Sequence, residues 1–374
     1  MKTSLLKYGL IYFCVIFFSI KITAQNTFKK KDSSIISMET KLHYGFIMPH
    51  HKYIQYLSTG HFTAFELNVG KQTNGRKKWH QLYNYPYIGL SFWTANMANP
   101  EVLGSVYTLY PYLNFNLVDH RKLDFNFRFG TGIAYITKKF EPFDNYKNLL
   151  IGTNLNVAIS LLYELKWAIQ QHIQLSTGVG MTHFSNGALK MPNLGINIPT
   201  VNVGVAYLLN TNKPFFVPTE SLCNKDTTKF EIQSIVSGGI KEIYPACGDK
   251  FGVFSWSNSL IKTWSLKRKI GVGIDLFWEF SNIRSLKRQG IEVKHAYEVI
   301  KPGVHVLHQL RFSRLSLVTQ IGFYIYAKDK SDGPIYDRLA LQYKLNNNIL
   351  LNVALKTHFA KADFVEWGIG YSIR

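Results

Sequence analysis

Apolar and polar residues alternate along most of this chain, in runs that end at glycine, proline, asparagine or aspartate. Successive side chains of a β-strand point to opposite faces, so a two-residue period predicts strands. The first half contains eight such runs, near residues 40–48, 61–71, 82–95, 104–117, 123–138, 152–165, 168–184 and 200–209. The second half contains eight more, near residues 230–243, 251–264, 268–281, 299–312, 314–327, 336–345, 348–360 and 363–373. Their length suits tilted membrane-spanning strands, because strands of soluble proteins usually have about five or six residues.

The pattern predicts an all-β fold, an antiparallel transmembrane β-barrel with about eight strands in each half. The chain has 26 Phe, 22 Tyr and 7 Trp, which suits the apolar outer face and aromatic girdles of such a barrel. Beyond residue 24, no apolar run reaches the ~20 residues of a transmembrane helix. Two arrangements fit, two tandem eight-stranded barrels or one barrel of about sixteen strands, since both leave no open sheet edge in lipid. A secreted β-sandwich shares the alternation and is the alternative fold.

The N-terminus has the composition of a secretory signal peptide. Lys2 and Lys7 precede or flank an apolar stretch that runs from Leu10 to Ile20, and Ala24 ends a small-residue cleavage site. We therefore expect a protein exported to the outer membrane of a Gram-negative bacterium. The expected organisation is a signal peptide (1–24), an N-terminal leader (25–38), a first barrel unit (39–210), a polar linker (211–229) and a second barrel unit (230–374).

The formal net charge is +20, and much of the positive charge is clustered near expected strand ends. We interpret the clusters as attracting the phosphorylated headgroups of a membrane surface; the alternative is that surface loops simply collect Lys and Arg. Nucleic acid is not an expected partner, given the export signal and the lack of a binding motif. The clusters are Arg76-Lys77-Lys78, Lys138-Lys139, Lys267-Arg268-Lys269 and Lys287-Arg288.

The two halves share short segments at corresponding places. Thr182-His183-Phe184-Ser185 recurs as Thr357-His358-Phe359-Ala360, and the segment 202–207 is echoed by 366–371. A repeat of about half the chain predicts a duplicated eight-strand unit. Because Ala360 has no hydroxyl, the second copy cannot repeat any chemistry that depends on Ser185.

The strongest candidate chemistry lies in the segment His183-Phe184-Ser185, at the end of an alternating run. In a strand, His183 and Ser185 stand on one face while Phe184 points to the other. A serine hydroxyl is a poor nucleophile until a neighbouring base takes its proton, and an imidazole is the usual base. The small residues that follow would let backbone N–H groups approach a reacting carbonyl, as an oxyanion hole requires. Two surface residues without a role would give the same short pattern.

These residues resemble the outer-membrane lipid A 3-O-deacylases of the PagL type, which are acyloxyacyl hydrolase-like. That family has a His-x-Ser-Asn motif, followed about ten residues later by Asn-x-Gly-x-acid. Here the two motifs read His183-Phe184-Ser185-Asn186 and Asn193-Leu194-Gly195-Ile196-Asn197. The resemblance covers roughly residues 40–210, and the second half looks like a degenerate copy. It implies an eight-stranded barrel that hydrolyses an acyl ester of lipid A, and so remodels lipopolysaccharide, by serine esterase chemistry.

By the same resemblance, Ser185 is the nucleophile, His183 the base, and Asn186 with the backbone at Gly187 the oxyanion site. Asn197 stands where the family has its acidic residue, so we expect Asn197 to be the third member. An amide can fix the imidazole tautomer but cannot neutralise the imidazolium, so this departure from the family pattern predicts slower hydrolysis. Glu66 and Glu164 are the substitute acids that the sequence offers.

The expected partner is lipid A in the outer leaflet, met by a membrane-embedded protein, and no cofactor or metal is expected. His43, His50, His51 and His61 gather around the first expected turn but lack the spacing of metal ligands. Two other functions stay open: a non-catalytic barrel that acts as a channel or structural lipid-binding protein, and an esterase for another lipid. The sequence does not determine the oligomeric state or the ester that is cut.

Overall fold

The structure is a computed structural model that describes residues 34–120, 123–210, 230–359 and 361–373. The expected signal peptide (1–24), the leader up to residue 33 and the expected linker (211–229) lie outside the described residues. The first strand begins at Ile36, inside the range expected for the leader, because the alternation of faces already starts there.

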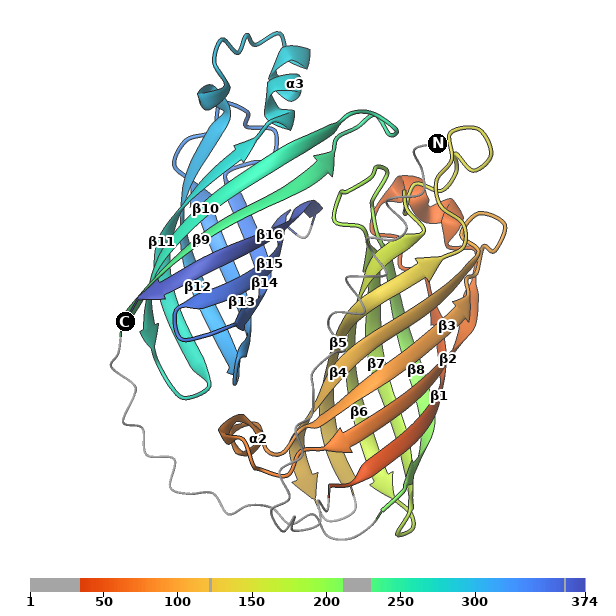
Figure 1. The fold of residues 1–374 in the computed structure, drawn as a ribbon. Helices are drawn as coiled ribbons and strands as arrows, with labels where there is room; N and C mark the ends of the chain where they lie inside the picture. The colour runs from red at the N-terminus through yellow and green to blue at the C-terminus, as the bar shows by residue number, and fades with distance from the viewer. Residues whose placement is uncertain (1–33, 121–122, 211–229, 360, 374) are drawn as a thin grey trace, which may run out of the picture. The chain divides into compact units, whose positions relative to one another are not determined.

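Eight strands of the first half close into an antiparallel barrel, in which β1 pairs with both β2 and β8 (Figure 1). We call this unit the first barrel. Each strand otherwise pairs with its neighbours in the sequence. The strands are β1 (Ile36–Phe46), β2 (His61–Gln72), β3 (Tyr87–Asn96), β4 (Ser105–His120), β5 (Leu123–Ile136), β6 (Leu155–Ala168), β7 (Ile173–Ser185) and β8 (Ile196–Leu208).

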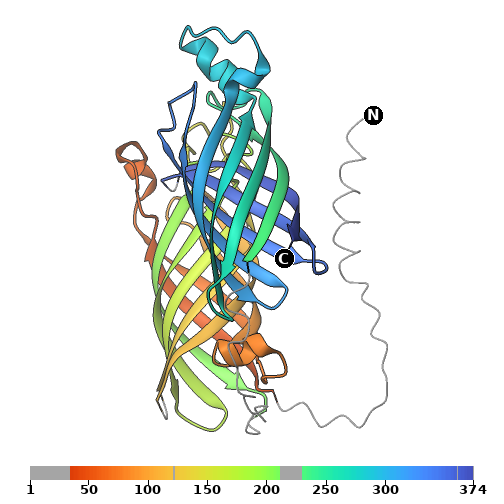
Figure 2. The ribbon, with the colours of Figure 1, turned by 90° about the vertical axis from the view of Figure 1, so that its left-hand side faces the viewer.

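Eight strands of the second half close in the same way, with β9 paired to β10 and β16, and we call this unit the second barrel (Figures 1 and 2). The prediction of two tandem eight-stranded barrels is confirmed, and the single sixteen-stranded barrel and the sandwich are excluded. The strands are β9 (Phe230–Glu242), β10 (Lys250–Thr263), β11 (Arg268–Glu279), β12 (Ile300–Phe312), β13 (Leu315–Tyr324), β14 (Ile335–Lys344), β15 (Ile349–His358) and β16 (Lys361–Ile373).

Short helices lie in the connections between strands and were not expected from the alternation. The expected strand 82–95 begins only at Tyr87, because Asn84 and Tyr85 adopt left-handed backbone angles (φ 56° and 53°) that a strand does not allow. In the part of the chain that the structure describes, no helix is both long and apolar enough to span a membrane. The helices are η1 (Lys52–Leu57), α2 (Lys78–Leu82), α3 (Ser281–Arg288) and η2 (Ala296–Val299).

The alternation separates an apolar outer wall from a polar interior. In β2, Leu67 and Val69 are 45% and 50% exposed, whereas Glu66 and Asn68 are buried. The other strands repeat this pattern, so large apolar side chains cover the outside of both barrels. An apolar belt on a closed sheet is what a barrel that spans a lipid bilayer requires.

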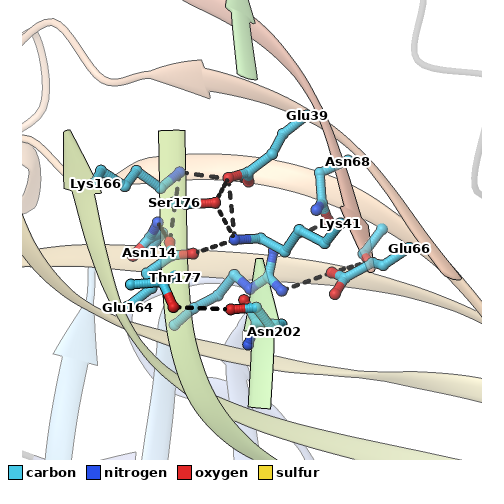
Figure 3. A network of polar contacts seen from close by, with 12 residues as sticks. Glu39, Lys41, Glu66, Asn68, Asn114, Glu164, Lys166, Ser176, Thr177 and Asn202 are labelled. Carbon is cyan, nitrogen blue, oxygen red and sulfur yellow. Dashed lines mark hydrogen bonds and ion pairs between the residues drawn. The ribbon is translucent and has the colours of Figure 1, made fainter. Parts of the chain in front are cut away.

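Charged side chains fill the middle of the first barrel (Figure 3). Lys41 bonds Glu164 at 2.6 Å and Glu39 at 3.0 Å, and Arg128 bonds Glu66 at 2.6 Å. Buried charges are tolerated only when each has a partner, and this network supplies partners by ion pairing. A filled interior argues against the expected alternative of a solute channel.

An apolar core lies above this network, at the rim where the connections 47–60, 97–104, 137–154 and 186–195 meet. We call this end of the first barrel the site rim. Phe184 of β7 belongs to the core and is fully buried, with its ring centroid 5.9 Å from that of Trp93. Burial of Phe184 fixes which face of β7 points inward, and the chemistry below depends on that choice.

Candidate active site

His183 and Ser185 lie at the end of β7, on the outer face of the first barrel. Because Phe184 between them is buried in the core of the site rim, strand geometry turns both neighbours outward. The expected shared face of His183 and Ser185 is therefore present on the outer side of the wall, where His183 is partly exposed and Ser185 is only 7% exposed. Ladder pairing places His183 opposite Asn197 of β8.

The His183 ring is held by the Asn197 side chain, with Nδ1 2.7 Å from Oδ1. An amide oxygen only accepts hydrogen bonds, so this contact assigns the proton to Nδ1 of His183. In the neutral ring, Nε2 then carries a free lone pair. That tautomer is the one that a base for a serine hydroxyl needs.

Gly195 makes room for the His183 ring. Its φ is +79°, and a Cβ atom at this position would stand 2.8 Å from Cε1 of His183. The Gly195 N–H donates to the Leu150 carbonyl at 3.0 Å, which fixes the connection from β7 to β8 against the neighbouring one. Any side chain here would strain the backbone and push the imidazole out of place.

The Ser185 hydroxyl is close in sequence to its proposed base but is not bonded to it. Among the residues that the structure describes, no hydrogen bond joins Ser185 to His183. Catalytic hydrogen bonds in enzymes without substrate are often long and tighten only when substrate binds. The two groups share a face and a strand end, which is the placement that the chemistry needs.

The donors of Asn186 are engaged in holding the β7–β8 connection. Its N–H donates to Oδ1 of Asn193 at 3.0 Å, and its Nδ2 donates to the Lys190 carbonyl at 2.8 Å and to Thr153 Oγ1 at 3.1 Å. An oxyanion role for Asn186 requires one of these bonds to be given up. The Gly187 N–H, at φ +62°, donates to no acceptor among the described residues, so an oxyanion role for it would break no existing hydrogen bond.

The two substitute acids lie on the wrong side of the barrel wall. Glu66 is bonded to His43 at 2.7 Å and to Arg128, and Glu164 is bonded to Lys41, all within the buried network of the interior. His183 faces outward, so neither carboxylate can orient it. The sequence did not show which face of these strands points into the barrel. The burial of Glu66 and Glu164 shows that both carboxylates point inward.

The structure adds a residue that sequence reasoning did not place at this site. Nδ1 of His50 lies 3.4 Å from Nδ2 of Asn197, on the side of the amide away from His183. His50 and Asn197 are 147 residues apart in the sequence, and no local pattern connects them. Only closure of the barrel between β1 and β8 brings the two segments together.

The other histidines near the first turn have separate environments. His43 lies inside the barrel, and His61 stacks on Tyr44 on the outer wall, with ring centroids 5.2 Å apart. Within the described ranges, no group of three or more His, Cys, Asp or Glu residues is arranged to hold a metal ion.

The repeated motif of the second half does not copy the site. His358 is buried inside the second barrel and its Nε2 lies 3.0 Å from the Tyr324 hydroxyl. The corresponding His183 faces outward, so the two histidines stand on opposite faces of their strands. A β-bulge between Lys356 and Thr357 accompanies this difference.

The basic clusters divide between the two ends of each barrel. In the first barrel, Lys138-Lys139 lies at the site rim and Arg76-Lys77-Lys78 at the opposite end. In the second, Lys267-Arg268-Lys269 follows β10 and Lys287-Arg288 lies in α3, so these two also fall at opposite ends. Lys269 is moreover buried and paired with Glu231 at 2.6 Å. Attraction to the phosphates of one membrane surface therefore involves only part of this charge.

Two protein-family models match the chain, one for each barrel. The model described as lipid A 3-O-deacylase (PagL) matches residues 63–206, and the model described as acyloxyacyl hydrolase, C-terminal domain, matches residues 230–374. No curated protein sequence gives a significant match.

Solved structures similar to the chain are outer-membrane proteins. The outer membrane enzyme PagL is 16% identical, with 44% of this chain and 97% of that chain covered and a TM-score of 0.30. Neisserial surface protein A (NspA) is 8% identical, with 46% and 96% covered and a TM-score of 0.32. The Pseudomonas putida toluene transporter TodX is 8% identical, with 91% and 89% covered and a TM-score of 0.18. By its two family matches, the chain joins a barrel of the lipid A 3-O-deacylase (PagL) family to a second barrel of the acyloxyacyl hydrolase C-terminal family.

Proposed function

We propose that the protein is an outer-membrane serine esterase that removes an acyl chain from lipid A, and that the first barrel carries the reaction. The observation that supports this most is the 2.7 Å contact between His183 Nδ1 and Asn197 Oδ1, next to Ser185 on the outer wall. The contact gives the imidazole the tautomer of a general base. The family match supplies the substrate class.

In the proposed reaction, Ser185 Oγ attacks the carbonyl carbon of the ester while its proton passes to Nε2 of His183. The Gly187 N–H stabilises the negative oxygen of the tetrahedral intermediate. Collapse of the intermediate breaks the bond between the carbonyl carbon and the sugar oxygen, and His183 gives its proton to that departing oxygen, which leaves as a hydroxyl. Water then attacks the acyl-enzyme with His183 again as base, which releases the fatty acid and restores Ser185.

The place of the site suits a substrate that stays in the membrane. Acyl chains of the lipid lie against the apolar outer wall, so an ester near the headgroup can reach Ser185 without leaving the bilayer. Lys138 at the same rim would add positive charge for the phosphates of lipid A, whereas Lys139 is already paired with Glu141 at 2.7 Å.

Asn197 sets a limit on the rate. Its amide oxygen fixes the tautomer of His183, but it carries no charge to stabilise the imidazolium that forms during the reaction. We therefore expect a slower enzyme than one with a carboxylate here. Asn197→Asp, which keeps the size of the side chain, should raise kcat by roughly tenfold or more.

Mass spectrometry of lipid A from cells that express the protein tests the proposal. Wild type should remove the mass of one acyl chain, and neither Ser185→Ala nor His183→Ala should do so. Fractionation and heat-modifiable mobility on gels should show that all three are folded in the outer membrane. Folded wild-type protein that leaves lipid A unchanged would refute the proposal and favour another lipid ester or a non-catalytic barrel.

A further inference from the structure

A chain of side-chain contacts continues from His183 through Asn197 to a second histidine at the site rim. His183 Nδ1 contacts Asn197 Oδ1 at 2.7 Å, Asn197 Nδ2 contacts His50 Nδ1 at 3.4 Å, and His50 Nε2 contacts the Leu194 carbonyl at 3.0 Å. We propose that His50 is a positioning residue for the esterase reaction: it sets the orientation of the Asn197 amide and, through it, the tautomer of His183. This inference rests on the function proposed above.

The backbone carbonyl of Leu194 sets the direction of the whole chain of contacts. A carbonyl oxygen only accepts, so Nε2 of His50 carries the proton and, in the neutral ring, Nδ1 is an acceptor. That acceptor faces Nδ2 of Asn197, which leaves Oδ1 for the proton on His183 Nδ1. The Met48 carbonyl, 3.5 Å from the same Nδ1 of His50, would favour a proton there, but the 3.0 Å contact of Nε2 with Leu194 is shorter and favours the proton on Nε2. The 3.4 Å contact between His50 Nδ1 and Asn197 Nδ2 is long and correspondingly weak.

An amide needs such a partner in a way that a carboxylate does not. Rotating the Asn197 amide by half a turn would exchange Oδ1 and Nδ2 and aim an N–H group at His183. His183 would then have to present a lone pair at Nδ1 and carry its proton on Nε2, where it cannot accept a proton from Ser185. An asparagine in place of a catalytic aspartate causes that wrong tautomer in a serine protease. The acceptor on His50 disfavours the rotated amide.

The backbone holds His50 in place for this role. The Met48 N–H donates to the carbonyl of Asn197 itself at 2.8 Å, which ties the segment before His50 to the start of β8. His50 therefore contacts both ends of the segment from Leu194 to Asn197. The imidazole itself is exposed at the surface, so replacing it leaves the core of the site rim intact.

Kinetics with purified, detergent-solubilised full-length protein and lipid A tests the role. We expect His50→Leu to lower kcat by about five- to tenfold with little change in KM, as expected for one weak neutral hydrogen bond. In His50→Asn, the acceptor Oδ1 is bonded to Cγ, as Nδ1 is in histidine. This variant should therefore recover much of the kcat that His50→Leu loses. His61→Leu is the control, because the exposed His61 stacks on Tyr44 and, among the described residues, contacts neither His50 nor Asn197. His51 is unsuitable, since its ring lies against that of His50 with centroids 4.8 Å apart.

A second background separates positioning from packing. In Asn197→Asp both side-chain oxygens are acceptors, so no rotation of the side chain can present a donor to His183. Adding His50→Leu in that background should lower kcat by less than about twofold. An equal loss in both backgrounds, or no loss in the wild-type background, would overturn the proposal.

The tautomer of His183 can also be read without activity. In refolded protein with ¹⁵N-labelled histidine, assigned with His183→Gln, wild type should show a proton on Nδ1 of His183. His50→Leu should show a mixture with the Nε2–H form. If the ¹⁵N chemical shifts of His183 were the same in His50→Leu as in wild type, the role of His50 would be refuted even if wild type cleaves lipid A. The predicted change in a protein inert toward lipid A would uphold it while the proposed function fails.

Discussion

The outer wall of the first barrel and the interior of the second each hold a serine and a histidine, and the two sites differ in completeness and in the direction that their side chains face. In the second barrel, Ser259 Oγ lies 3.0 Å from His305 Nε2, and His305 Nδ1 lies 2.8 Å from Asp275 Oδ2. These distances are those of a hydrolytic triad. All three side chains are nonetheless buried inside the barrel, at 5%, 4% and 1% exposure. The outer-wall site has no carboxylate and no formed serine–histidine bond, and Ser185 is itself only 7% exposed, but both side chains point out of the barrel and not into its filled interior.

The interior of the first barrel also holds a hydroxyl, an imidazole and a carboxylate in contact, which indicates that this arrangement is structural. Thr200 Oγ1 lies 3.2 Å from His43 Nδ1, and His43 Nε2 lies 2.7 Å from Glu66. In both barrels an arginine, Arg128 or Arg338, bonds the carboxylate as well. We conclude that the series of hydroxyl, imidazole and carboxylate has a structural role, in which each buried polar group of the interior has a hydrogen-bond partner. The outward direction of the strand face, and not the distances alone, distinguishes the candidate active site from these interior arrangements.

The largest expected effect separates the two serines directly. Ser185→Ala should lower kcat for lipid A by at least about 10⁴-fold, because it removes the nucleophile. The purified variant should keep the unfolding midpoint of wild type, since only a small hydroxyl on the outer face is lost. If the variant retained activity, Ser185 would not be the nucleophile, and the outer wall could no longer be distinguished from the interior as the site of the reaction.

Removing Asp275 should damage the second barrel without reducing catalysis at the first. Asp275→Ala leaves the buried His305 without its acceptor and takes one carboxylate partner from Arg338, so the free energy of unfolding should fall by about 3 kcal/mol or more. Denaturant unfolding of the refolded protein in lipid vesicles measures this. The activity of the fraction that stays folded should equal that of wild type, and a selective loss of kcat would instead give the interior a catalytic role.

Crowding the His183 ring should weaken the outer-wall site while the barrel stays folded. Gly195→Ala places a Cβ about where the ring now lies, 2.8 Å from Cε1, at a φ of +79°. Misplacement of a catalytic group by about 1 Å can cost ~10²-fold in rate, and we expect a loss of that size in kcat. Gly290→Ala in the second barrel, also at positive φ but with open space around it, is the control for backbone strain alone.

The smallest effect should follow loss of the interior serine. Ser259→Ala removes one neutral hydrogen bond to His305 and should cost about 1 kcal/mol of stability. Activity toward lipid A should not change within error. Loss of activity comparable to that of Ser185→Ala would show that the buried arrangement is reached by substrate.

The strands and the candidate chemistry could be predicted from the order of the residues alone. A two-residue period is a local property of the chain, so alternation alone predicts sixteen strands and places His183 and Ser185 on one face. The spaced motif ending at Asn197 identified the family that the first barrel matches. The export signal, the cleavage site and the catalytic roles remain predictions.

Tertiary structure decided which strands close a barrel and which face points outward. Closure pairs β1 with β8 and β9 with β16, and no local signal specifies pairing between residues so far apart. The direction in which a side chain points depends on what the two faces of its strand pack against. Phe184 packs in the core, so its neighbour His183 points outward. Glu66 and Glu164 form ion pairs inside the barrel, so they point inward. The same closure brings His50 to Asn197. Alternation tells which residues share a face, but only packing across the closed barrel tells which face meets lipid and which meets the interior.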